Sequence, residues 1–269
     1  MDVNKYFEGV EQLKFLAKKE VGQNFLIDKG KASLIVFALE ADSSDCVLEI
    51  GCGAGSLSYF LSKGPAKSTL IDIDEAMITK LQNDFKDNEF LKIQMGNAMK
   101  FDYSPYTKIV GNLPYYITSA IIEKTLIEAT RATRLVFMIQ KEAADRIMAK
   151  TNTKEYAPLN ILLSLRGKTK KIFNVSKNCF SPRPHVDSTV IQIDLDANFD
   201  ENVIKAFKLS QSLFLKRRKT IYNNLKDLLH DETKTKRLLE ECGIPLTYRP
   251  EQISPEQYLL LSNNKQLIK

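Results

Sequence analysis

Short apolar runs alternate with amphipathic stretches along the first two thirds of the chain. The apolar runs are residues 46–50, 68–73, 90–95, 108–111, 134–139, 171–175 and 189–195. Patterns of helical period lie between them, over residues 56–62, 75–85, 119–129 and 141–149. Strands alternating with helices predict an α/β domain whose sheet is mostly parallel and covered by helices.

The end of this pattern differs from its beginning. Residues 175–188 contain Pro182 and Pro184 and show no helical period, so we expect the last strand to return antiparallel. Only helical patterns follow, over 201–215, 219–229, 235–242 and 255–262. The sequence therefore predicts two domains, an α/β domain over residues 1–196 and a small all-α domain over residues 197–269.

Composition narrows the class of protein. Hydrophobic residues make up 43% of the chain and charged residues 27%, which is typical of a folded globular protein. There is no apolar run long enough to span a membrane, and residues 1–20 are charged where an export signal would be apolar, so we expect a cytoplasmic protein without membrane contact. The four cysteines form no CxxC pair and only two histidines occur, so we expect reduced thiols and no metal site.

Positive charge is concentrated locally. The net charge of +6 is mild. Between Glu155 and Asp187, however, six basic residues occur without a single acid, and they are Arg166, Lys168, Lys170, Lys171, Lys177 and Arg183. This distribution predicts a positive face suited to phosphate groups.

A glycine-rich segment, Glu49-Ile50-Gly51-Cys52-Gly53-Ala54-Gly55, joins the first strand of the sheet to a helix. Glycines at such a turn let the backbone approach a ligand, although an unliganded tight turn would read the same. Asp72 ends the next strand, where its carboxylate can accept hydrogen bonds from ribose hydroxyls or simply face solvent. The glycine spacing resembles that of S-adenosylmethionine-dependent methyltransferases more than that of dehydrogenases.

The tetrapeptide Asn112-Leu113-Pro114-Tyr115 follows the fourth strand. It resembles the motif of methyltransferases that act on exocyclic amino groups of nucleobases. The amino nitrogen of adenine is conjugated with its ring and is a poor nucleophile, so the asparagine oxygen and the adjacent backbone carbonyl can accept its two N–H bonds and direct its lone pair. Tyr115 can stack on the displaced base. The alternative is an ordinary proline turn with a packed tyrosine.

Further blocks extend the resemblance over almost the whole chain. They are Gly22 to Leu26, Gln140 to Glu142, Phe180 to Ser188 and Arg217 to Thr220. Together they resemble the small-subunit ribosomal RNA adenine N6,N6-dimethyltransferase family. The resemblance implies a Rossmann-like class I methyltransferase fold with a seven-stranded sheet. It also implies transfer of two methyl groups from S-adenosylmethionine to each of two adjacent adenosines in the 3′-terminal hairpin loop of 16S rRNA, late in assembly of the 30S particle.

The resemblance assigns roles to individual residues. It implies a cofactor site of Asn24, Leu26, Gly51, Gly53, Asp72, Asn97 and Asn112. It implies a catalytic site of Asn112, Leu113, Pro114, Tyr115 and Phe180, with no metal. Asp72 stands where the family usually has Glu, Asn97 where it has Asp and Cys52 where it has Pro. Phe180 would face Tyr115 across the target base, unless it is an ordinary core residue.

The resemblance also implies contacts to RNA. The basic residues concerned are Arg183, Arg217, Arg218 and Lys219. We expect the run from Lys216 to Lys219 to open a helix, so that part of it faces its own domain. The expected partner is small-subunit rRNA in the pre-30S particle, and we expect a monomer.

Two other functions are compatible with parts of the sequence. The macrolide-resistance type of 23S rRNA adenine N6-methyltransferase shares the fold and the Asn112 to Tyr115 type of motif, but the Arg217 to Thr220 block favours the small-subunit enzymes. A catalytically idle RNA-binding assembly or transcription factor could be built on the same fold. The intact Gly51, Asp72 and Asn112 favour an enzyme.

Overall fold

A computed structural model describes residues 2–17, 22–196, 200–265 and 267. Within them the chain forms two compact units. The first combines residues 1–144 with 169–197, and the second combines residues 145–168 with 198–269. No helix in these described ranges is long and apolar enough to cross a membrane.

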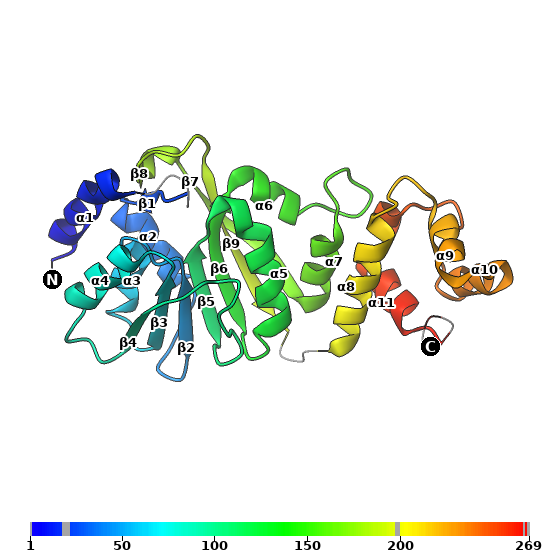
Figure 1. Ribbon diagram of the computed structural model, residues 1–269, viewed down its shortest axis with the longest axis horizontal. Coiled ribbons are helices and arrows are strands. Elements are labelled where there is room, and N and C mark those ends of the chain that lie inside the picture. Colours follow the sequence, from blue (N-terminus) through cyan, green and yellow to red (C-terminus); the bar gives the residue numbers. More distant parts are fainter. Residues whose placement is uncertain (1, 18–21, 197–199, 266, 268–269) are drawn as a thin grey trace. The chain divides into compact units, whose positions relative to one another are not determined.

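A mixed seven-stranded sheet organises the first unit, in the order β4-β3-β2-β5-β6-β9-β7 (Figure 1). The strands are β2 (Cys46–Ile50), β3 (Lys67–Asp72), β4 (Leu91–Met95), β5 (Lys108–Asn112), β6 (Arg134–Gln140), β7 (Gly167–Val175) and β9 (Ser188–Leu195). The five strands β2 to β6 pair with one another in parallel, whereas β9 runs antiparallel to β6. The predicted fold class and the predicted antiparallel strand are confirmed.

Six α-helices of the described residues belong wholly or largely to this unit. They are α1 (Val3–Gln12), α2 (Lys29–Phe37), α3 (Ser56–Leu61), α4 (Glu75–Asp84), α5 (Thr118–Glu128) and α6 (Lys141–Ile147). The sequence analysis predicted no helix at α1 or α2. Both begin with an aspartate cap, since Asp2 accepts a hydrogen bond from the Lys5 N–H and Asp28 accepts one from the Lys31 N–H.

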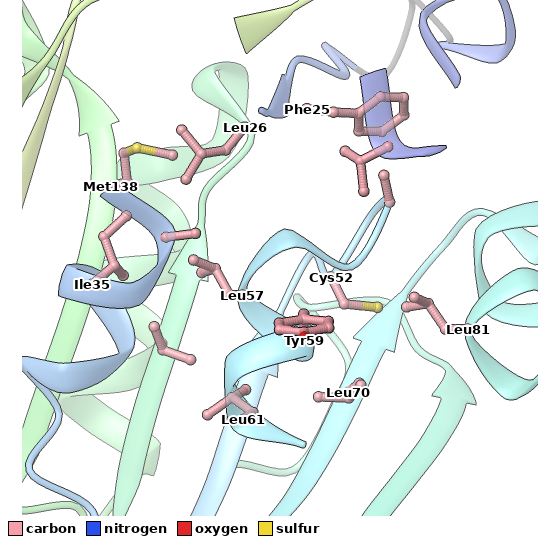
Figure 2. Close-up of a cluster of buried hydrophobic side chains, with 14 of the residues drawn as sticks. Phe25, Leu26, Ile35, Cys52, Leu57, Tyr59, Leu61, Leu70, Leu81 and Met138 are labelled. Carbon is pink, nitrogen blue, oxygen red and sulfur yellow. The ribbon is translucent and has the colours of Figure 1, made fainter. Parts of the chain in front are cut away.

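The core of the first unit is assembled from α2, α3 and the inner strands (Figure 2). Ile35 of α2 and Leu57 of α3 are at most 3% exposed, as are Leu70 of β3 and Met138 of β6. Burial of each such side chain contributes about 1.5–3 kcal/mol relative to exposure. A two-stranded sheet, β1 (Phe25–Leu26) with β8 (Phe180–Ser181), brings residues 25 and 26 against the same core.

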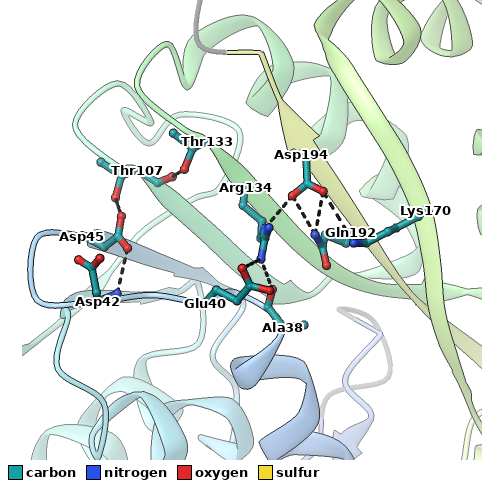
Figure 3. Close-up of polar contacts among 10 residues, drawn as sticks. All are labelled: Ala38, Glu40, Asp42, Asp45, Thr107, Thr133, Arg134, Lys170, Gln192 and Asp194. Carbon is teal, nitrogen blue, oxygen red and sulfur yellow. Dashed lines mark hydrogen bonds and ion pairs between the residues drawn. The ribbon is translucent and has the colours of Figure 1, made fainter.

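A polar network around Arg134, at the start of β6, ties the loop after α2 to the sheet (Figure 3). The Arg134 Nε lies 2.6 Å from Asp194 Oδ1 on β9, and its Nη1 lies 2.7 Å from Glu40 Oε2. The same Nη1 donates to the carbonyl of Ala38, which caps α2. These groups lie at the strand end opposite to the glycine turn, so they support the sheet without contributing to the cleft described below.

The second unit is helical. Its helices are α7 (Pro158–Arg166), α8 (Glu201–Phe214), α9 (Ile221–Leu229), α10 (Glu232–Glu241) and α11 (Pro255–Asn263). Tyr156 and Tyr258 are about 1% exposed or less in its core, and their hydroxyls donate to the carbonyls of Ile253 and Pro250.

Two features differ from the sequence analysis. The predicted domain boundary assigns all of residues 1–196 to the α/β domain, whereas residues 145–168 belong to the second unit, because Tyr156 and Ile161 share its hydrophobic core. Residue 197, at which the predicted helical domain begins, lies outside the described residues. The prediction that the basic run opens a helix is wrong, since residues 215–219 form a turn and α9 begins after its cap, Thr220.

Candidate active site

A cleft of about 270 Å³ opens at the carboxyl ends of the parallel strands. Four consecutive neighbours in the sheet supply its walls: Gly51 follows β2, Asp72 ends β3, Asn97 follows β4 and Asn112 ends β5. The chain order reverses between β2 and β5, because β3 and β4 continue on one side and β6 on the other. Ligands in open α/β sheets bind at such a switch point.

The glycine turn requires its glycines. Gly51 and Gly53 have φ angles of +70° and +47°, a region that side chains with a Cβ rarely adopt. The N–H groups of Gly51 and Cys52 donate to the Ile71 carbonyl at 2.9 and 3.1 Å, which fixes the turn against β3. A Cβ on Gly53 would lie 3.4 Å from the Phe25 ring. The turn thus presents bare backbone to the cleft.

Asp72 connects the turn to the next loop. Its Oδ2 accepts a hydrogen bond from the Gly53 N–H at 2.8 Å, and its Oδ1 accepts one from the Asp74 N–H at 2.9 Å. Burial nevertheless raises the pKa of Asp72 above its ordinary value, and the two backbone donors oppose that rise. Each carboxylate oxygen keeps a lone pair that can accept from a ligand hydroxyl.

A second carboxyl group lies beneath the turn. Glu49 is 1% exposed and accepts a hydrogen bond from the Ser58 hydroxyl at 2.7 Å. Burial raises its pKa from 4.5 to about 8, with a further contribution from the nearby charge of Asp72. Glu49 is therefore protonated at neutral pH, which avoids two negative charges under one glycine turn.

The segment before α2 forms another wall of the cleft. Asn24 and Leu26, which the resemblance assigns to the cofactor, both line it. The backbone carbonyl of Asn24 accepts a hydrogen bond from Asn112 Nδ2 at 3.1 Å. That bond orients the Asn112 amide and leaves its Oδ1 with no donor among the described residues, so this oxygen is available as an acceptor.

The tetrapeptide after β5 places a second acceptor beside Asn112. The Pro114 carbonyl is occupied, because it accepts from the Ile117 N–H and the Thr118 hydroxyl. The Leu113 N–H donates to Met138, but none of the described residues donates to the Leu113 carbonyl. Asn112 Oδ1 and the Leu113 carbonyl are therefore adjacent acceptors without protein donors.

Tyr115 is held by its hydroxyl, which lies 3.2 Å from the Ser188 Oγ. Burial raises the pKa of Tyr115, and its hydrogen bond to Ser188 opposes the rise. The ring lines the cleft from the short 3₁₀ helix η3 (Tyr115–Ile117). A neutral, fixed ring of this kind can serve as a stacking surface.

Asn97 lies on the exposed side of the cleft. Its Oδ1 accepts a hydrogen bond from the Met99 N–H at 2.9 Å, so the side chain closes its own turn. One lone pair of that oxygen remains for a ligand.

Phe180 and Cys52 are embedded in the core. Phe180 is 3% exposed, pairs with Leu26 between β8 and β1, and is not among the residues that line the cleft. Its predicted position across from Tyr115 stays a prediction. Burial raises the pKa of the Cys52 thiol, which is 4% exposed, so a nucleophilic role is disfavoured.

The four predicted RNA contacts have different surroundings. Arg183 is exposed and makes no hydrogen bond or ion pair with the described residues. Arg217 donates to the carbonyls of Thr153 and Lys154 and lies 3.4 Å from a Glu251 oxygen. These contacts occupy the Arg217 guanidinium within its own unit.

Lys219 and Arg218 also differ. The Lys219 ammonium pairs with Asp227 at 3.0 Å, and Lys216 shares that carboxylate. Arg218 is exposed and has no partner among the described residues. Arg218 is therefore the member of the run that is most available to phosphate.

Sequence reasoning assigned no role to three residues that line the cleft, Gln23, Phe25 and Tyr116. Phe25 packs its ring beside Gly53, and Asp74 accepts a hydrogen bond from Gln23 Nε2 at 2.9 Å, which ties the segment before α2 to the loop after β3. Tyr116 lines the cleft next to Tyr115. The only sequence signal for Tyr116 is that it directly follows another tyrosine. Hydrophobic periodicity does not assign a role to such a repeat.

Comparisons with known proteins agree with this geometry. The model of the ribosomal RNA adenine dimethylase family matches residues 14–267. A ribosomal RNA small subunit methyltransferase A from Malacoplasma penetrans is 38% identical over 262 residues, covering 95% of this chain and 94% of the relative. One of the same name from Clostridium botulinum is 36% identical, covering 95% and 96%.

Solved structures show the same fold. A dimethyladenosine transferase from Plasmodium falciparum superposes with a TM-score of 0.77 at 26% identity, covering 87% of this chain and 94% of that one. The 23S rRNA methyltransferase ErmE superposes with a TM-score of 0.68 at 21% identity, covering 91% and 100%, which shows the fold alone.

The sheet order and the cleft at its switch point define a class I methyltransferase fold. Both the family model and the relatives extend over nearly the whole chain, including its helical part. The chain belongs to the ribosomal RNA adenine dimethylase family.

Proposed function

We propose that this protein transfers methyl groups from S-adenosylmethionine to N6 of two adjacent adenosines in the 3′-terminal hairpin loop of small-subunit rRNA. The observation that carries the proposal is the pair of acceptors without donors among the described residues, Asn112 Oδ1 and the Leu113 carbonyl, whose residues line a glycine-lined cleft. Family membership supports the adenine, and the names of the two relatives support the small subunit.

The acceptor pair matches the chemistry of an amino group on an aromatic ring. Two hydrogen bonds from N6 to these oxygens draw the nitrogen lone pair out of conjugation and direct it along one line. Tyr115 holds the base by stacking. After the nitrogen has gained a methyl group it carries an acidic proton, which can leave to water or to the same carbonyl oxygen, so no dedicated base is required.

The groups that line the cleft suit the chemical groups of S-adenosylmethionine. The bare backbone at Gly51 and Gly53 allows close approach, the Asp72 carboxylate suits the ribose hydroxyls, and Asn97 suits the adenine amino group. When bound, this cofactor supplies an electrophilic methyl group on a sulfonium. Among the described residues, no three His, Cys, Asp or Glu side chains are grouped to hold a metal ion.

S-adenosylmethionine should bind with the same affinity in buffer with and without a chelating agent. The proposed contacts need no metal ion, because Asp72 binds the ribose hydroxyls and Asn97 binds the adenine amino group. Isothermal titration in both buffers measures this. Loss of binding on chelation would contradict the proposed mode of binding. Asp72→Ala should weaken binding, whereas Asp102→Ala, which removes an exposed carboxylate outside the cleft, should not.

The substrate is tested by reverse transcription. Dimethylated adenosines block base pairing, so primer extension on small-subunit rRNA should stop at the 3′ hairpin only when unmodified particles are incubated with the protein and cofactor. Stops in 23S rRNA instead would indicate the large-subunit activity. Binding to particles without methylation would indicate an idle RNA-binding factor. The cytoplasmic location and monomeric state remain predictions.

Arg218→Ala should weaken binding to the ribosomal particle without lowering thermal stability, because this guanidinium has no protein partner among the described residues. Its loss should reduce the slope of log affinity against log salt by roughly 0.7–0.9 if it contacts one phosphate. Affinity measured over a salt series gives the slope. An unchanged slope would place Arg218 on an idle surface.

Arg217→Ala is the matched control. Its guanidinium contacts Thr153, Lys154 and Glu251, so this variant should lose thermal stability first. If Arg217→Ala instead lowered the salt slope without any loss of stability, the division of roles between these two arginines would be wrong.

A further inference from the structure

Tyr116 combines exposure with a place in the cleft. The residue is 61% exposed, yet it lines the same cleft as Asn112 and Tyr115. Other strongly exposed aromatic residues, such as Phe15 and Phe37, do not line it. An aromatic ring left in water at the edge of a binding cleft is a surface without a partner in this chain.

The backbone separates the two tyrosine rings. Both belong to η3, and successive side chains of a 3₁₀ helix point about 120° apart. Tyr115 is held inward by Ser188, whereas the Tyr116 hydroxyl makes no hydrogen bond with the described residues. The Tyr116 ring is therefore not needed to complete the protein's own packing or hydrogen bonding.

The segment at Gly22, which lies near the Tyr116 ring, leaves one edge of the ring uncovered. Gly22 has a φ of +68°, and a Cβ built on it would lie 4.0 Å from Tyr116 Cδ1. No side chain of residue 22 can therefore cover that edge of the ring. The segment before α2 and η3 thus border an open approach to the cleft.

A base entering the cleft creates a need for such a ring. A target base that leaves its stack also unstacks the nucleotide beside it, and single-stranded RNA is commonly held by stacking unstacked bases on aromatic side chains. Each such stack contributes about 1–3 kcal/mol. Tyr115 serves the target base in the proposed function, so Tyr116 is left for its neighbour.

We propose that Tyr116 is a positioning residue that stacks on the nucleotide adjoining the target adenosine. The inference rests on the proposed function, in which that nucleotide is the second adenosine of the pair.

Three substitutions test whether the aromatic ring itself is needed. Tyr116→Phe keeps the ring, Tyr116→Leu keeps an apolar side chain without a ring, and Tyr116→Ala removes the side chain beyond Cβ. With unmodified small-subunit particles as substrate, the Leu and Ala variants should lose roughly tenfold in kcat/KM, mainly through a higher KM for the particle. The Phe variant should remain within about twofold of wild type, and S-adenosylmethionine affinity should not change in any variant.

A change in the RNA provides the second measurement. Particles carrying uridine at the neighbouring position have a weaker stacking partner. Tyr116→Ala should therefore cost less on these particles than on normal ones, and the two changes should not multiply. Independent, multiplying effects would overturn the proposal, as would a Leu variant equal to wild type or a Phe variant as poor as Ala.

Measurements on the wild-type protein distinguish a failure of the proposed function from a failure of the role proposed for Tyr116. Wild-type methylation of the particle tests the proposed function, and the ratios of the variants to wild type test Tyr116. An inactive wild type would overturn both, whereas an active wild type with unchanged ratios would overturn only the role of Tyr116. A loss of thermal stability in the Leu and Ala variants that accounts for their lost activity would assign Tyr116 to the fold.

Discussion

Replacing Asn112 with alanine should lower the single-turnover methylation rate at saturating cofactor by about a hundredfold. The substitution removes the Oδ1 acceptor, which a hydrogen bond from Nδ2 to the Asn24 carbonyl holds in a fixed orientation. Loss of one preorganised hydrogen-bonding group at a reacting centre costs on the order of 3 kcal/mol in transition-state stabilisation. Rapid-quench measurement of methyl transfer to the particle gives the rate.

Asn97→Ala is the matched control for this experiment. It removes the same type of side chain from the same cleft, but the Asn97 amide oxygen closes a turn with the Met99 N–H and does not lie beside the Leu113 carbonyl. It should raise the cofactor concentration needed for half-maximal rate and leave the saturated rate nearly intact. An Asn112→Ala variant that keeps most of its rate would show that this side chain is not catalytic.

The wild-type protein should lose stability relative to Glu49→Gln as the pH rises from about 4.5 to about 8. The folded state raises the pKa of Glu49 to about 8, so in this range it retains a proton that the unfolded state has released. Raising the pH then favours unfolding, by about 1.4 kcal/mol for each pH unit between the two pKa values. Below both pKa values the difference between the proteins should be constant.

Denaturant unfolding of both proteins at several pH values gives this difference. Glutamine has nearly the shape of protonated glutamate and can still accept the Ser58 hydrogen bond, so the comparison isolates the titration. Asp72 and Cys52 are present in both proteins, and their own titration largely cancels in the difference. Parallel stability curves would show that Glu49 is ionised in the folded protein and that burial does not dominate its pKa.

Local patterns were sufficient for the architecture of the first unit. The seven predicted strands and the helices between them agree with the sheet, because period and β-branched content are properties of the segments themselves. The helices α1, α2 and α7 were missed. In α7, six of the nine residues are apolar and recur on most sides of the helix, so it lacks the broad polar face that makes a helix recognisable.

The sequence by itself determined that three of the nominated residues meet at one edge of the sheet. Gly51, Asp72 and Asn112 each end or follow a parallel strand, and the carboxyl ends of parallel strands necessarily share one edge of the sheet. Their convergence therefore needs no knowledge of loops or of side-chain packing.

Only the tertiary structure decided which of the nominated groups remain available. Arg217 and Lys219 look equivalent to Arg218 in the sequence, but Glu251 and Asp227 reach the first two and not the third. Folding brings Arg217 to Glu251, 34 residues further along the chain, so its ion pair cannot be read from local spacing. Burial acts in the same way, because the surroundings that protonate Glu49 come from several elements packed together, and desolvation depends on all of them at once.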